Sequence, residues 1–123
     1  MNMNKLVNVL NLGRLDYKAA LKIQKHFLEQ SLSKLKVDPS CQIENTLLLV
    51  EHNPVYTIGL RRKTYPTHEL DKLRSLNADV EYTDRGGLIT YHGPGQLVAY
   101  PIFYLKNFTP SVKWYVIFLQ KKN

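Results

Sequence analysis

A long amphipathic helix is the feature that most constrains how this chain can fold. Apolar residues recur at steps of three and four after Asp16, a suitable N-cap, and predict a helix that ends near Lys36. The predicted buried stripe consists of Tyr17, Ala20, Leu21, Gln24, Phe27, Leu28, Leu32 and Leu35. Because one apolar stripe must be covered by a second layer, other elements of the chain have to pack against this helix.

Short strands and two further helices make up the rest of the predicted structure. Apolar and β-branched residues bounded by turn residues predict strands over 5–12, 46–51, 55–58, 80–83, 88–91 and 96–105. Helices are predicted over 67–76 and 112–120, the second of them after Pro110. Strands and helices do not alternate regularly, and this order predicts the α+β class, with a mixed β-sheet flanked by helices.

Size and composition indicate one soluble folded domain. The 123 residues suit a single domain, and 44% apolar with 22% charged residues is ordinary globular usage. The single cysteine, Cys41, excludes an internal disulfide and a multi-cysteine zinc site. The longest apolar runs, such as 47–50, are far shorter than the roughly 20 residues of a membrane-spanning helix. His26, His52 and His68 show no paired ligand spacing, so we expect neither a metal nor a cofactor.

The chain carries a marked positive charge. Lys plus Arg number 17 against 10 Asp plus Glu, a formal charge of +7 that favours an acidic partner: nucleic acid, an anionic membrane face or an acidic protein. Only charge supports nucleic-acid binding, because the sequence has no recognised module and no interleaved exposed aromatic residues. We therefore expect neither nucleic acid nor a membrane as the partner.

The first residues allow two interpretations. Residues 1–14 contain Lys5 and Arg14 but no acidic residue, a composition that a mitochondrial presequence would share. The segment also reads as a strand, with Val7 and Val9 on one face and leucines on the other, followed by Gly13. The strand is the favoured interpretation, and targeting stays open at this point.

The densest chemical signal is the segment 85–96, which holds four of the six glycines of the chain together with Arg85, Tyr91 and His92. Glycines let a ligand approach the backbone, an arginine can bind carbonyl or phosphate oxygens, and a histidine can donate, accept or act as a base. The alternative is a pair of tight turns around a strand, with Arg85 in solvent. Composition alone leaves both interpretations open.

Two blocks carry a resemblance to a known family. EHNPVYTIG over Glu51–Gly59, followed by DRGGLITYHGPGQLV over Asp84–Val98, resembles the octanoyltransferases of lipoate biosynthesis, which belong to the lipoate/biotin protein ligase catalytic-domain group. The resemblance extends from about residue 6 to residue 116. It implies a mixed sheet with an apolar tunnel for an octanoyl chain and a substrate-binding segment made of Arg85, Gly86, Gly87, Leu88, Ile89, Thr90, Tyr91 and His92.

The resemblance also implies the reaction and its partners. Family members take octanoyl from acyl carrier protein and attach it to a lysine of lipoyl domains of 2-oxoacid dehydrogenases or of the glycine cleavage H protein. The sequence looks more like the mitochondrial, animal type, with the cytoplasm as the location if it is bacterial. The basic triplet Arg61, Arg62 and Lys63 could dock the acidic carrier protein, or it could simply form a solvated loop.

The family's nucleophilic cysteine and its activating lysine lie downstream of the glycine-rich block, and residues 1–123 hold no matching pair. We therefore expect a single incomplete catalytic domain with a divergent tail over 117–123, and no catalytic residue in this part. Cys41 precedes the motif, so we expect an ordinary thiol there. The expected activity is octanoyl transfer, with this form inactive. The alternative is a non-catalytic fragment that binds an acyl chain or the carrier protein.

Overall fold

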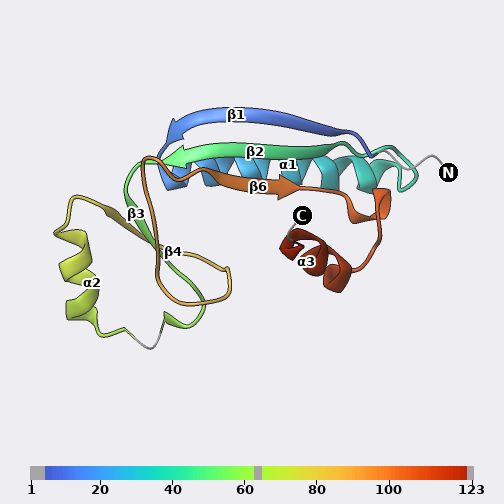
Figure 1. The fold of residues 1–123 in the computed structure, drawn as a ribbon. Coiled ribbons are helices and arrows are strands. Elements are labelled where there is room, and N and C mark those ends of the chain that lie inside the picture. Colours follow the sequence, from blue (N-terminus) through green and yellow to red (C-terminus); the bar gives the residue numbers. More distant parts are fainter. Residues whose placement is uncertain (1–4, 63–64, 122–123) are drawn as a thin grey trace. The chain divides into compact units, whose positions relative to one another are not determined.

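The computed structural model describes residues 5–62 and 65–121. Its elements are, in chain order, β1 (Val7–Leu15), α1 (Tyr17–Val37), β2 (Asn45–His52), β3 (Val55–Ile58), α2 (Thr67–Arg74), β4 (Asp79–Tyr82), β5 (Thr90–His92), β6 (Val98–Ile102), the 3-10 helix η2 (Leu105–Asn107) and α3 (Val112–Gln120). Figure 1 shows this order from blue to red. The α+β class is confirmed, but the strands form two three-stranded sheets rather than one.

The contacts of the chain divide it into two compact units. The described residues of unit 1 lie within Met1–Leu10, Ile23–Leu48 and Tyr100–Asn123, and those of unit 2 within Asn11–Lys22 and Leu49–Ala99. The first sheet and α1 contribute residues to both units, whereas β3, α2, β4 and β5 belong to unit 2 alone. The glycine-rich segment 85–96 therefore lies wholly in unit 2.

The first sheet has the strand order β1-β2-β6, with the arrows of β1 and β2 pointing one way and that of β6 the other (Figure 1). Its central strand, β2, is buried or half-buried along its whole length, as expected for a strand with neighbours on both sides. β6 contains Pro101, which an edge strand tolerates because one side of it has no ladder partner. β6 is shorter than the predicted strand over 96–105.

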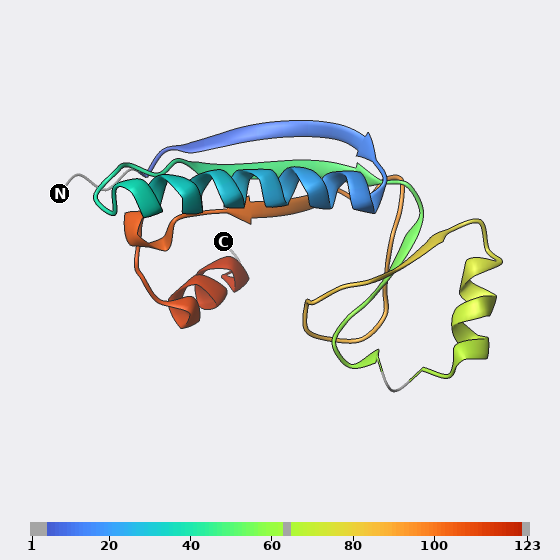
Figure 2. The ribbon, with the colours of Figure 1, turned by 180° about the vertical axis from the view of Figure 1, so that it is seen from behind.

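α1 runs along one face of the first sheet (Figure 2). Its predicted start after Asp16 is confirmed, and it ends at Val37, before Pro39. The predicted stripe is only partly correct, because Ala20 is buried while Leu28 and Leu32 are each 50% exposed. At about 100° per residue these two leucines lie to one side of the line through Ala20, so the buried face is narrower than the apolar pattern.

Unit 1 is held together by two buried asparagines. The Asn45 side chain donates to the Leu6 carbonyl over 2.9 Å and accepts from the Tyr104 backbone N–H over 3.1 Å. The Asn107 side chain donates to Asn45 Oδ1 over 3.1 Å and to the Ile43 carbonyl over 2.8 Å. Because both asparagines are almost completely buried, these bonds replace water and fix the backbone of η2 against the start of β2.

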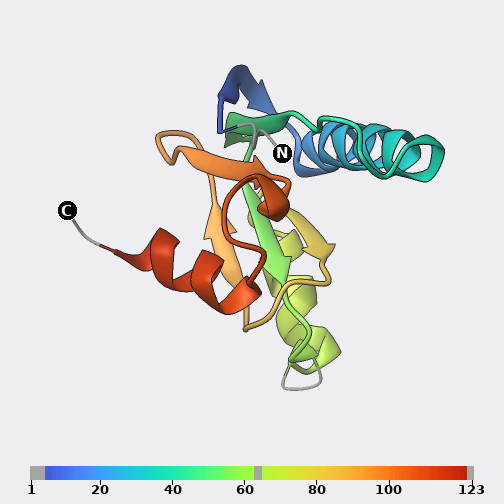
Figure 3. The same ribbon diagram turned by 90° about the vertical axis from the view of Figure 1, so that its right-hand side faces the viewer.

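The second sheet has β3 between β4 and β5, as Figure 3 shows face on. β3 runs parallel to β4, with Val55 opposite Asp79, and antiparallel to β5, with Val55 opposite His92. Val55 and Ile58 are fully buried, α2 packs on β4, and Leu70 is the buried residue of α2. β5 begins at Thr90 rather than 88, and α2 ends at Arg74 rather than 76. No helix in the described ranges is long and apolar enough to cross a membrane.

Candidate functional site

The glycine-rich loop between β4 and β5 is fastened to β3 by Arg85. The Arg85 Nη2 atom donates to the Thr57 carbonyl over 2.7 Å, to Thr57 Oγ1 over 2.8 Å and to the Leu88 carbonyl over 2.9 Å. Its Nη1 atom donates to the Gly86 carbonyl over 2.8 Å. The guanidinium is therefore surrounded by acceptors of its own chain, and the Leu88 carbonyl, which the sequence placed in a strand, is one of them.

Two glycines let the loop approach β3 closely. A Cβ atom on Gly59 would collide with the Gly87 carbonyl oxygen and would lie 3.0 Å from Arg85 Nη1. Gly87 itself has φ +97°, a left-handed conformation that strongly favours glycine. The backbones of the two motif blocks can therefore touch because Gly59 lacks a side chain, and Gly87 is required by its φ rather than by lack of space.

Further bonds fix the ends of the loop. The Leu60 backbone N–H donates to the Arg85 carbonyl over 2.9 Å, and the Ile89 N–H donates to the Tyr65 hydroxyl over 3.2 Å. Thr83, just before the loop, bonds the Ile58 carbonyl through its N–H over 2.8 Å and through its hydroxyl over 3.0 Å. The loop is therefore preorganised before any ligand arrives.

A pair of histidines lies beside this loop in unit 2. His52 is fully buried, with its ring centroid 6.0 Å from that of His92 and 5.6 Å from that of Tyr17. Burial lowers the pKa of His52, although its Nδ1 lies 3.3 Å from the Leu15 carbonyl, which acts in the opposite direction. Burial, then His52, then Arg85 lower the pKa of His92. Both imidazoles are therefore neutral at neutral pH and can donate or accept one hydrogen bond at each ring nitrogen.

The turn over residues 93–95 is also bonded to the motif block Glu51–Gly59. Glu51 Oε1 accepts from the Gly95 backbone N–H over 2.6 Å, and Gly95 has φ +89°. The Tyr91 ring packs on the Tyr56 ring, with centroids 5.1 Å apart. The blocks Glu51–Gly59 and Asp84–Val98 thus meet at both of their ends.

The predicted substrate-binding residues fall into two groups. Leu88 is 40% exposed and Tyr91 42% exposed, and Gly86 and Thr90 are exposed as well. Arg85, Gly87, Ile89 and His92 are half-buried. The exposed group therefore places apolar and backbone surface in solvent, and in the half-buried group Arg85 bonds the backbone of the loop.

The residues of the basic triplet Arg61, Arg62 and Lys63 differ in their surroundings. Arg62 donates from Nη2 to the Thr83 carbonyl over 2.6 Å, and its guanidinium lies over the Tyr82 ring, 5.0 Å from the centroid. Arg61 is exposed. Lys63 lies outside the described residues.

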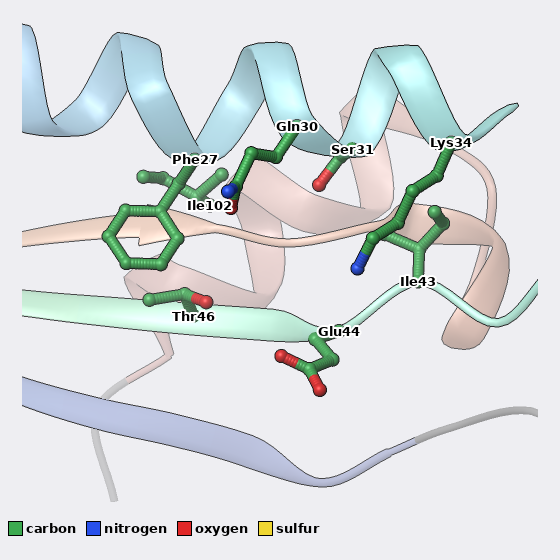
Figure 4. A pocket seen from close by; sticks show the side chains of 8 residues that line it. All are labelled: Phe27, Gln30, Ser31, Lys34, Ile43, Glu44, Thr46 and Ile102. Atoms are coloured by element: carbon green, nitrogen blue, oxygen red, sulfur yellow. The ribbon is translucent and has the colours of Figure 1, made fainter. Parts of the chain in front are cut away.

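Unit 1 contains a small cavity between α1 and the first sheet, shown in Figure 4. It measures about 40 Å³ and is lined by Phe27, Gln30, Ser31, Lys34, Ile43, Glu44, Thr46 and Ile102. By this measure one water needs about 10–15 Å³, so the cavity has room for a few waters and is too small for an octanoyl chain. Cys41, also in unit 1, is a free thiol that follows α1 and lies beside Val37 in a shallow surface hollow.

Sequence reasoning gave no individual role to several residues that shape this site. Glu51, His52, Thr57 and Gly59 all lie in the first motif block, so their place in the motif was the available signal. Tyr65 had no signal, because nothing in the sequence marks its hydroxyl as the acceptor for Ile89.

Comparison with known proteins identifies the family. Residues 16–121 match the model of the lipoyl protein ligase A/B catalytic domain, and the chain belongs to that family. Among its relatives are the zebrafish mitochondrial octanoyl-acyl-carrier-protein:protein N-octanoyltransferase LIPT2, 54% identical over 94% of this chain, and the Drosophila melanogaster putative lipoyltransferase 2, 50% identical over 94% of this chain. The octanoyltransferase of the bacterium Persephonella marina is 39% identical over 94% of this chain.

The relatives are longer than this chain. It covers 49% of the zebrafish protein, 48% of the fly protein and 51% of the Persephonella protein, so it spans about half the length of these relatives. The crystal structure of Plasmodium falciparum LipL1 in complex with lipoate matches with a TM-score of 0.51 at 21% identity, over 75% of this chain and 29% of that one. This similarity supports the fold.

Proposed function

We propose that this chain is the acyl-binding part of an octanoyltransferase of lipoate biosynthesis. The observation that carries the proposal is the 54% identity, over 94% of the chain, to a protein named for octanoyl transfer from acyl carrier protein to protein. The proposed substrates are octanoyl-acyl carrier protein and the lipoyl domains of 2-oxoacid dehydrogenases or the glycine cleavage H protein. The proposed location is the mitochondrion, as the names of the zebrafish and fly relatives state for those proteins.

The proposed binding segment is Arg85–His92. Leu88 and Tyr91 offer exposed apolar surface for the acyl chain, and Gly86 leaves its backbone open to a narrow ligand. His92 is neutral and can donate an N–H to the thioester carbonyl, where negative charge develops during acyl transfer. Arg61 is the proposed contact to the acidic carrier protein.

Acyl transfer between two proteins needs a nucleophile that carries the acyl group. The only cysteine among the 123 residues is Cys41, which precedes the glycine-rich segment in the sequence, whereas the nucleophilic cysteine implied by the family resemblance follows it. We therefore propose that a polypeptide of these 123 residues binds the octanoyl thioester but does not turn it over. Binding without catalysis is the alternative function, and the position of Cys41 favours it for this polypeptide alone.

The binding test uses octanoyl-pantetheine, with pantetheine as the control ligand, followed by amide chemical shifts. We expect changes at residues 85–92 with the thioester only. Leu88→Asp should abolish them, because a carboxylate would replace the apolar surface, while the matched variant Leu76→Asp, at a leucine that is 60% exposed, should not. Failure of the wild-type protein to bind would refute the proposed function.

The turnover test adds octanoyl-acyl carrier protein and an apo lipoyl domain to the purified protein. Mass spectrometry then looks for an octanoyl group on the lipoyl lysine. We expect none above the rate without protein. Protein-dependent acylation would refute the proposal of binding without turnover and would direct attention back to Cys41.

A further inference from the structure

The contacts of Arg85 point to a role that differs from binding a substrate oxygen. Its guanidinium donates to the carbonyls of Thr57, Gly86 and Leu88 and to the Thr57 hydroxyl, so its hydrogen-bonding fork is engaged within the chain. Arginine suits this arrangement because its planar fork reaches several acceptors at fixed angles, which a lysine cannot do. The positive charge is thus surrounded by peptide dipoles.

Thr57 extends this set of contacts to the next strand. Its hydroxyl accepts from Arg85 and donates to the Thr90 carbonyl over 3.4 Å, at the start of β5. Thr57 is only 1% exposed, and Gly59 is also buried, so neither can contact a ligand on the surface of the loop. Any effect of these two residues on a ligand must pass through the loop.

We propose that Arg85 is a positioning residue: together with Thr57 and the bare backbone at Gly59, it holds residues 86–90 in the shape that binds the octanoyl thioester and does not itself bind the substrate. The proposal rests on the proposed function for the ligand, but the shape of the loop can be measured without any ligand. According to this proposal, specificity for a narrow acyl chain depends on the contacts of Arg85 with the buried residues Thr57 and Gly59.

The test compares variants that separate contact from positioning. Thr57→Val keeps the shape and removes the hydroxyl, Thr57→Ser keeps the hydroxyl, and Arg85→Lys keeps the charge but loses the fork. Thr46→Val, at a buried threonine of unit 1, and Arg74→Ala, at an exposed arginine of α2, serve as matched controls.

If Arg85 positions the loop, Arg85→Ala, Arg85→Lys and Thr57→Val should each weaken octanoyl-pantetheine binding by about tenfold, the effect of losing a hydrogen bond or two. Thr57→Ser and both controls should bind like the wild type. If Arg85 instead contacts the substrate, Arg85→Lys should retain most of the affinity and Thr57→Val should leave it unchanged. That result would overturn the proposal.

Amide hydrogen exchange provides the readout without ligand. The Leu60 and Ile89 N–H groups are bonded to the Arg85 carbonyl and the Tyr65 hydroxyl, so they report the closed loop. Exchange there should accelerate about tenfold in Arg85→Ala and Thr57→Val, with the Cys41 N–H in unit 1 unchanged. Unchanged exchange at both loop amides would refute positioning. Failure of the wild type to bind the thioester, with accelerated exchange in the variants, would refute the proposed function and retain the loop-holding role.

Discussion

Acidification from pH 7.5 to pH 5 should destabilise unit 2 through its two histidines. Burial lowers the pKa of both His52 and His92 below the ordinary 6.5, and His52 further disfavours a charge on His92. Below pH 6.5 the unfolded chain binds protons that the folded chain does not. The free energy of unfolding is therefore highest above pH 6.5 and falls as the pH drops towards the folded pKa values.

The size of the effect is bounded by proton counting. Each histidine can contribute a slope of at most about 1.4 kcal/mol per pH unit, so the two together reach at most about 2.7 kcal/mol per pH unit. Two neighbouring groups also favour the neutral imidazoles. Arg85 lowers the pKa of His92, and the Tyr17 ring packs against His52. The Leu15 carbonyl at His52 Nδ1 acts in the opposite direction, because it raises the pKa of His52.

Urea unfolding followed by circular dichroism at half-unit steps of pH measures this slope. His92→Gln should reduce this slope below pH 6.5, because one of the two proton sites is removed. His26→Gln, at an exposed histidine of α1, should leave it unchanged. Constant or rising stability on acidification would show that the imidazolium forms are accommodated and would refute the reasoning.

Three further predictions concern unit 1. Asn45→Ala removes hydrogen bonds to Leu6, Tyr104 and Asn107, and should lower the free energy of unfolding by about 3 kcal/mol in urea titrations, at about 1 kcal/mol per bond. The Ser111 hydroxyl accepts from the Trp114 N–H over 3.2 Å at the start of α3, so Ser111→Ala should cost about 1 kcal/mol and accelerate exchange of that amide. Cys41→Ser should change neither thioester binding nor stability by a measurable amount, and a loss of binding would contradict the role given to this thiol.

The helices could be predicted from sequence because their signals are local. The Asp38-Pro39 turn after α1 and the start of α3 at Val112 follow from residues that are adjacent in the chain. The bond between Thr57 and Arg85 could not be predicted, because a threonine in a strand and an arginine in a turn 28 positions away carry no mark of each other. The exposure of Leu28 had a similar cause, since periodicity fixes the spacing of a stripe but not how much of it the neighbouring layer covers.

In unit 2, the residues that join the two motif blocks are restricted in type, whereas the stretch around α2 can vary. The blocks Glu51–Gly59 and Asp84–Val98 touch through Arg85, through the bare backbone at Gly59 and through Glu51, and each of these contacts needs a particular side chain or the lack of one. The intervening helix α2 packs on β4 and leaves its polar face in solvent. Since loop and helix excursions add little closure entropy per residue, the part of this stretch around α2 can change in length, provided that Tyr65 and Thr83 keep their bonds to Ile89 and Ile58. The residue types in the two motif blocks are therefore restricted far more tightly than those between them, because the two blocks contact each other.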